Sequence, residues 1–441
     1  MTADAVYFSL MVGLGETYVP AFALAVGLGE IVAGLVATLP MLVGAIFQTV
    51  TPFAVRRLRS YRRWVVVCAV AQAASFLPLV VGAAVGRISL VWLGFATVTY
   101  WSFGMAAGPA WNAWVTSLVP TELRSRFFAR RTRAGQAALF AAILAAGFLL
   151  DAGRHRDAEL WLFAVIFAMA AFARLISSHF LSMQSEAPDL AAGHRTLHPE
   201  EIFSAVRQAR SVRVFAYLLG VQAAVHVAAP FFTPYMLGPL SLSYTQFMVL
   251  TAAAFLARVA VLPLLGRMAH HRGTGFILWW GAIGIVPLPV LWLVSHEFGY
   301  LLVLQIFSGT SWAALELATL LSFFERIPDE ERASVLTLFN VGNAIAIGLG
   351  ALLGSWIFLD LEGSTSVYVW LFAISSTGRL LVLAALRGTR PAHDVGNVQL
   401  RTLAVRPSAG LIARPILATL DDDEPAPLHR AGDAANGPGG R

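Results

Sequence analysis

The sequence predicts an all-α, polytopic membrane protein with about 12 transmembrane helices in two pseudo-symmetric six-helix bundles. Three observations predict this class. The chain is 58% hydrophobic and only 13% charged, about half the charged share of roughly 25% in soluble proteins. Long apolar runs recur along the chain, and motifs of the first half return in the same order in the second half. A soluble globule could not cover so much apolar surface, whereas a lipid bilayer does.

Twelve apolar runs reach the length of about 20 residues that crosses a bilayer. The first run follows no basic region, so we expect it to be retained as a span rather than removed as a signal peptide. Prolines inside several runs are expected to kink the helix without ending the span, because neighbouring helices satisfy the freed backbone groups. The predicted spans are 5–28, 31–54, 64–86, 89–118, 134–150, 160–181, 213–236, 246–267, 276–295, 300–324, 334–358 and 367–387.

Arginine is distributed unevenly between the loops, and this predicts the orientation. All 31 basic residues are arginine. Fourteen of them lie in the segments 55–63, 123–133 and 182–213, which the positive-inside rule places in the cytoplasm. An even number of spans then leaves both termini cytoplasmic. Absence of lysine and abundance of alanine indicate GC-rich codons, so we expect a multi-pass protein of the bacterial inner (plasma) membrane.

The spans divide the chain into four parts. Residues 1–181 form the predicted N-terminal six-helix bundle and 213–387 the C-terminal one. Residues 182–212 form a cytoplasmic linker. Residues 388–441 form a cytoplasmic tail whose last part is acidic and rich in proline and glycine, which predicts disorder.

Three local similarities relate the halves. PFAVRRLRSYRR after the second span corresponds to GRMAHHRGTG after the eighth, 266 − 52 = 214 residues later. PTELRSRFF after the fourth span corresponds to PDEERASVL after the tenth, 328 − 120 = 208 residues later. The sixth span carries WLFA and then Arg174, and the twelfth carries WLFA and then Arg379. Such a duplication is expected of a protein that rocks one bundle against the other around a central site.

The stretch GRMAHHRG resembles the loop signature of the major facilitator superfamily, Gly-x-x-x-Asp-Arg/Lys-x-Gly. Gly266 and Gly273 match its glycines, whereas His270 stands at the position of the acid and His271 at that of the base. Residues 108–128 and 308–321 are similar to a bacterial branch of that superfamily. The resemblance implies a transporter with alternating access and a cytoplasmic gate. The other gate-loop candidates are Arg56, Arg57, Arg124 and Arg332.

Three charged residues, Glu16, Arg258 and Glu316, lie inside predicted spans, roughly 13–17 Å from their cytoplasmic ends. A lone charge at that depth costs at least about 2.5–3.5 kcal/mol. We therefore predict that Arg258 pairs with Glu316, and that Glu16 is the freer acid, facing a central cavity to carry protons or contact substrate. The alternatives are a structural ion pair and a structural acid bonded to backbone or to another helix.

Further polar or aromatic residues are candidates for the cavity wall. Gln222 and His226, four residues apart, share a helix face, and Asn340 and Asn343 share another. Trp312 precedes Glu316 by one turn, and Asn112 lies between two tryptophans. Amides inside a membrane also serve to bind helices together, so that interpretation stays open for them.

Enzyme signatures are missing from the sequence: it contains no phosphate loop, zinc-protease helix motif, nucleophile elbow or dinucleotide fingerprint. We therefore predict no enzyme, no cofactor and no metal site. The expected function is secondary active transport of a small solute, coupled to protons in symport, by a monomer in the lipid bilayer, without nucleic acid. Two alternatives remain open, a transporter-like sensor or assembly factor and a membrane-embedded enzyme.

Overall fold

The computed structural model describes residues 2–36, 38–118, 121–154, 156, 158–186, 212–326, 329–361 and 366–386. Within these ranges all regular structure is helical. The linker prediction for 182–212 falls largely outside them, and so does the tail 388–441.

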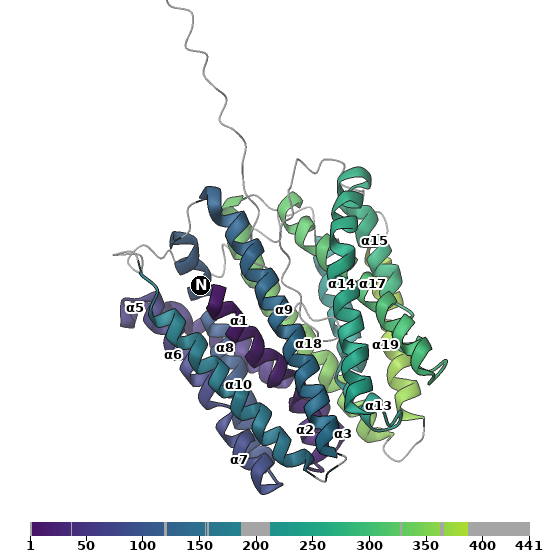
Figure 1. The fold of residues 1–441 in the computed structure, drawn as a ribbon. Helices are drawn as coiled ribbons and strands as arrows, with labels where there is room; N and C mark the ends of the chain where they lie inside the picture. Colours follow the sequence, from purple (N-terminus) through teal and green to yellow (C-terminus); the bar gives the residue numbers. More distant parts are fainter. Residues whose placement is uncertain are drawn as a thin grey trace, which may run out of the picture.

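The described part of the first half contains six stretches long and apolar enough to cross a membrane. Several of them consist of more than one helical segment (Figure 1). In chain order the segments are α1 (Thr2–Leu14), η1 (Glu16–Tyr18), α2 (Val19–Ala25), α3 (Glu30–Leu35), α4 (Leu39–Phe47), η2 (Gln48–Val50), α5 (Thr51–Leu58), α6 (Tyr61–Ala74), α7 (Leu77–Val85), α8 (Leu90–Leu118), α9 (Thr121–Arg154) and α10 (Glu159–Ser182).

The second half repeats this plan. Its segments are α12 (Val212–Ala228), η4 (Ala229–Phe231), α13 (Phe232–Leu237), α14 (Tyr244–Arg272), α15 (Thr274–Ile285), α16 (Leu288–Leu291), α17 (Phe298–Arg326), α18 (Asp329–Asp360), α19 (Val367–Leu383) and η5 (Ala384–Leu386). The packing repeats as well: α1 lies against α9 and α10, as α12 lies against α18 and α19.

Eleven stretches of the described chain are long and apolar enough to cross a membrane. The predicted ninth span differs, because it is divided into α15 and the short α16 at Val286 and Pro287. Pro20, Pro40 and Pro78 each stand in the first turn of a new helical segment within a continuing span. A proline lacks the N–H that the preceding turn would bond, so the helix restarts there.

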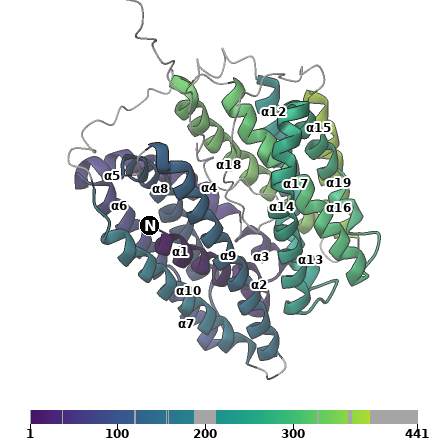
Figure 2. The same ribbon diagram turned by 45° about the horizontal axis from the view of Figure 1, so that its top comes forward.

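The two bundles lie side by side, the first coloured purple to blue and the second teal to yellow (Figures 1 and 2). Where they meet, α9 contacts α14, and α18 contacts α3 and α4. We call the end where α5 turns into α6 the arginine-rich end, and the end where α9 turns into α10 the arginine-poor end. Large apolar side chains such as Val91, Val303 and Leu381 are exposed on the outside of the bundles, as a lipid-facing surface requires.

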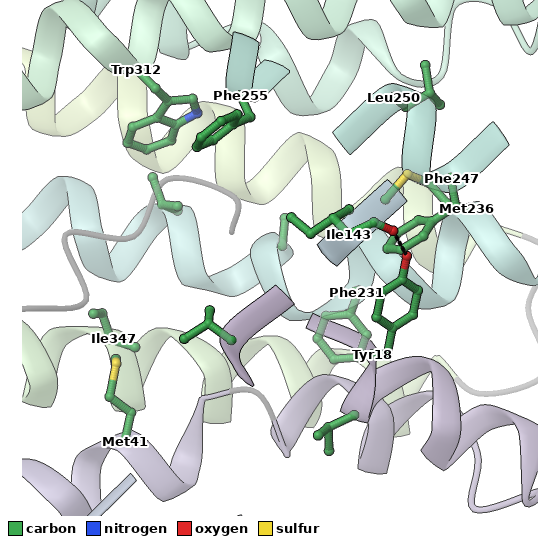
Figure 3. Packing of buried hydrophobic residues seen from close by; sticks show 14 of the residues in the cluster. Tyr18, Met41, Ile143, Phe231, Met236, Phe247, Leu250, Phe255, Trp312 and Ile347 are labelled. Atoms are coloured by element: carbon green, nitrogen blue, oxygen red, sulfur yellow. Dashed lines mark hydrogen bonds between the residues drawn. The ribbon is translucent and has the colours of Figure 1, made fainter. Parts of the chain in front are cut away.

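A buried apolar cluster joins the bundles (Figure 3). Tyr18, fully buried in the first bundle, donates its hydroxyl to the carbonyl oxygen of Ile143 at 2.7 Å. Its ring lies edge-on to Phe247 of α14, with centroids 6.3 Å apart. The rings of Phe140 in α9 and Phe255 in α14 also stack between the bundles, with centroids 6.2 Å apart. The first span, α9 and α14 are therefore packed together around the middle of the molecule.

Candidate transport cavity

A cavity of about 210 Å³ lies between the bundles, and both halves line it. Apolar surface predominates in its wall. The polar side chains that matter below are Glu16, Tyr100, His226, Arg258, Gln305 and Arg379. Mostly apolar walls with a few convergent polar groups are typical of sites for small molecules.

Glu16 lies where the first span is interrupted, in the 3₁₀ turn between α1 and α2. The absence of a side chain at Gly15 allows this turn to approach Phe76, because a Cβ there would lie 2.4 Å from the ring. The Tyr100 hydroxyl, on α8, donates a 2.5 Å hydrogen bond to Glu16 Oε2. Glu16 is therefore a cavity-lining acid held by a second helix.

Arg258 of α14 and Glu316 of α17 form an ion pair, with Nη1 and Oε1 3.0 Å apart. Their side chains are 5% and 10% exposed. Gly309 makes the approach of the two helices possible, because a Cβ there would lie 2.2 Å from the Ala254 carbonyl oxygen. The predicted pairing is confirmed, and Arg258 also lines the cavity.

Other predicted residues are divided between the cavity and the packed interior. His226 and Trp312 line the cavity. Gln222 and Asn343 are buried but do not belong to its lining, and the Gln222 backbone carbonyl bonds His226 Nδ1 at 2.8 Å. The side chains of Asn112 and Asn340 lie outside the described part of the structure.

A polar network inside the first bundle was not anticipated. Arg174, on α10, donates from Nε to Gln72 Oε1 at 3.0 Å and from Nη1 to Ser177 Oγ at 2.9 Å. Ser177 donates to Asp4 Oδ1 at 2.7 Å, and Asp4 Oδ2 pairs with Arg131 Nη2 at 3.1 Å. The buried guanidinium of Arg174 thus has hydrogen-bond acceptors for two of its nitrogens. Through Ser177 it is also linked to the carboxylate of Asp4.

Arg379, the repeat counterpart of Arg174, was also missed as a site residue. Its side chain is buried and lines the cavity, with Nη1 donating to the Ile285 carbonyl oxygen at 2.7 Å. The recurrence of WLFA followed by arginine in the sixth and twelfth spans was the signal that could have drawn attention to it.

The predicted gate loops lie at the arginine-rich end. Arg56, Arg57 and His271 are exposed there, near the ends of α5 and α14. Gly273 has φ 81° and ψ 156°, a conformation that favours glycine, where α14 turns into α15. Gly266 shows no such requirement, because nothing lies within 4 Å of a Cβ built there. The side chains of Arg124, His270 and Arg332 are not among those described.

Three carboxylate–hydroxyl hydrogen bonds join the bundles at the arginine-poor end. Thr245 donates to Asp151 at 2.8 Å, and Tyr244 donates to Glu159 at 2.5 Å. Tyr368 donates to Glu30. In each pair the carboxylate belongs to the first half and the hydroxyl to the second. We call these three pairs the carboxylate clasp.

The described residues contain no cluster of three or more His, Cys, Asp or Glu that could hold a metal ion. The fold and the cavity together define a polytopic helical membrane protein of the two-bundle class.

Comparison with known proteins agrees with this class. The sequence profile of the Major Facilitator Superfamily matches residues 214–420. A crystal structure of a mutant of the nucleoside transporter NupG aligns with a TM-score of 0.68 and 11% identity, covering 88% of this chain and 99% of that one. The crystal structure of a D-xylose-proton symporter aligns with a TM-score of 0.62 and 14% identity, covering 88% and 95%. No curated protein sequence matches the chain.

In sequence, the second half of the chain therefore resembles the Major Facilitator Superfamily, and the described fold resembles that of these two transporters. The chain is a multi-pass, all-helical membrane protein. Members of that superfamily are generally not enzymes.

Proposed function

We propose that this chain is a secondary active transporter that moves a small solute across a bacterial cell membrane by alternating access, driven by protons. The observation that carries the proposal is the position of Glu16. It is the only acidic side chain among the described residues of the cavity wall. It also lies at a helix interruption, where substrate and ion sites of secondary transporters commonly occur.

Glu16 has the chemistry that proton coupling needs. As a carboxylate it accepts the Tyr100 hydrogen bond. Protonation removes its charge and converts one of its oxygens into a donor. The hydrogen bond between Glu16 and Tyr100 of α8 therefore changes when Glu16 takes up a proton. This change occurs in the wall of the cavity that we propose for the solute. The Arg258–Glu316 pair lies in the same region and is proposed as a second charged element of the cycle.

The distribution of arginine supports an orientation with the arginine-rich end in the cytoplasm. In that orientation α1 begins and η5 ends on the cytoplasmic side, and the carboxylate clasp closes the outer end. We infer that the structure represents a state closed to the outside. The linker 182–212 and the tail 388–441 would then be cytoplasmic, and the arginine-rich loops would form the inner gate of a monomeric transporter.

The test is uptake of a solute panel into proteoliposomes that contain the purified full-length chain, with and without an inwardly directed proton gradient. The panel should contain nucleosides and pentoses, because the structural neighbours carry nucleosides and D-xylose. It should also contain small organic acids and their amides. We expect at least one solute to accumulate only with the gradient and only in protein-containing liposomes. Uptake of every solute at the rate of protein-free liposomes would overturn the proposal.

A further inference from the structure

Arg379 is a buried cation with few partners. Its side chain belongs to a residue that is 3% exposed, and it donates one hydrogen bond, to the Ile285 carbonyl oxygen. Its Nε is buried and has no hydrogen-bond partner. No salt bridge to it occurs among the described residues. A charge buried without a counter-ion is strongly unfavourable, so its persistence calls for a group that pairs with it at some stage.

Arg174, the counterpart of Arg379 in the first half, has more hydrogen-bond partners than Arg379. The two arginines follow the same WLFA motif in the sixth and twelfth spans. Arg174 bonds Gln72 and Ser177, and Ser177 bonds Asp4. Arg379 lines the cavity, which Arg174 does not. The duplicated arginine therefore bonds side chains of its own bundle in one half and lines the cavity in the other.

His226, which also lines this cavity, has a second buried polar atom without a hydrogen-bond partner. It is completely buried, and its Nδ1 lies 2.8 Å from the Gln222 carbonyl oxygen. A carbonyl oxygen only accepts, so Nδ1 carries the hydrogen, and Nε2 of the neutral ring is an acceptor. Nε2 is buried and has no partner. Ser375 Oγ donates to the Ala224 carbonyl oxygen at 2.7 Å, which ties α19, bearing Arg379, to α12, bearing His226.

We propose that Arg379 and His226 form a subsite for a monovalent organic acid that also carries a hydroxyl or amine donor. The acid's carboxylate would accept from the Arg379 guanidinium, and its O–H or N–H would donate to His226 Nε2. With Glu16 protonated, charge balance favours one negative charge, because Arg258 is already neutralised by Glu316 and Arg379 is then the remaining charge of the described cavity wall. The mostly apolar wall and the volume of about 210 Å³ suit a small organic body rather than a bare inorganic ion.

This inference rests on the proposed transport function and names the class of its substrate. Binding at equilibrium separates the two claims, because it requires no transport. The probes are mandelate, mandelamide, which lacks the charge, and phenylacetate, which lacks the hydroxyl. Each is titrated calorimetrically at constant ionic strength into the full-length chain in lipid nanodiscs.

We expect mandelate to bind about tenfold or more tightly than mandelamide, because the amide oxygen still accepts a hydrogen bond but lacks the negative charge that pairs with the guanidinium. Mandelate should bind a few-fold more tightly than phenylacetate, which lacks the hydroxyl. Arg379→Gln should bring mandelate to the affinity of mandelamide, and Arg379→Lys should retain part of the difference. His226→Leu should remove the preference for mandelate over phenylacetate. Arg174→Gln, the matched control, should leave both preferences unchanged.

Equal binding of mandelate and mandelamide by the natural chain, or no binding of either, would overturn the subsite. So would unchanged mandelate affinity in Arg379→Gln. The comparison of mandelate with mandelamide in the natural chain tests the subsite even if a variant does not fold. If mandelate binds with these preferences but no solute enters proteoliposomes, transport fails and the subsite stands. If gradient-driven uptake is found without charge discrimination, the subsite alone fails.

Discussion

Thr245 donates a 2.8 Å hydrogen bond to Asp151 and thereby ties the first turn of α14 to the last turn of α9. Tyr244 and Tyr368 make the corresponding bonds to Glu159 and Glu30. All three cross between the bundles at the arginine-poor end. A clasp of few, exchangeable bonds at one end is what a protein needs if that end must open and close.

Removing the hydroxyls of the clasp should favour opening of the arginine-poor end. We expect the double variant Tyr244→Phe/Thr245→Val to expose the cavity more often from outside, because two of the three bonds are lost. The measurement is the labelling rate of Thr251→Cys, a cavity residue, by an impermeant maleimide. Cys68 is the only natural cysteine, so Cys68→Ala provides the background. Tyr300→Phe removes a bond to Leu291 within the second bundle and serves as control. Equal rates in the double variant and its parent would contradict the clasp.

Breaking the Arg258–Glu316 pair from one side should be more harmful than removing both charges. Glu316→Gln leaves a buried guanidinium without its counter-ion, and we expect a loss of about 3–5 kcal/mol in the free energy of unfolding. The double variant Arg258→Met/Glu316→Leu should recover most of the lost free energy of unfolding. Denaturant titration in detergent micelles measures the free energy of unfolding of the single and the double variant. If the single and double variants are equally unstable, the pair is not the cause. A stable double variant without transport would assign the pair to the coupling cycle rather than to the fold.

Gly309→Ala should separate α14 from α17. The added Cβ would lie 2.2 Å from the Ala254 carbonyl oxygen, and overpacking of this kind costs about 1–3 kcal/mol. Gly299→Ala, in the same helix with nothing within 4 Å of the new Cβ, should be neutral or stabilising by up to about 1 kcal/mol. Thermal unfolding followed by tryptophan fluorescence distinguishes the two variants. A lower midpoint for Gly299→Ala than for Gly309→Ala would disprove the packing argument.

Neutralising Asp4 should weaken the polar network of the first bundle. Asp4 accepts from Ser177 and Arg131, and Asp4→Asn replaces a charged acceptor, for an expected loss of about 1.5–3 kcal/mol. Asp360→Asn, at an exposed position on α18, is the control with no expected change. The unfolding free energies of the two variants decide the matter, and an Asp4→Asn protein as stable as its parent would show that the network carries little energy.

Charge and hydrophobic periodicity were enough to predict the helical spans and the pairing of buried opposite charges. Arg258 and Glu316 could be paired in advance because opposite charges at similar depth in apolar spans have few other solutions. The hydrogen bond between Tyr100 and Glu16 could not be predicted, because the residue pattern of one helix does not indicate which residue of another helix faces it. The acids of the clasp resemble ordinary loop acids, and only tertiary packing brings them to hydroxyls of the other half. Likewise, Arg174 and Arg379 look alike in sequence and differ only in what surrounds them.

The most direct measurement of the central claim is a comparison of net uptake and exchange in Glu16→Gln proteoliposomes. Net uptake under a proton gradient requires the proton to be carried, whereas exchange of labelled for unlabelled solute requires only that the cavity change sides. We predict that Glu16→Gln abolishes gradient-driven accumulation and keeps exchange, while the exposed control Glu297→Gln retains both. Undiminished accumulation in Glu16→Gln would contradict it.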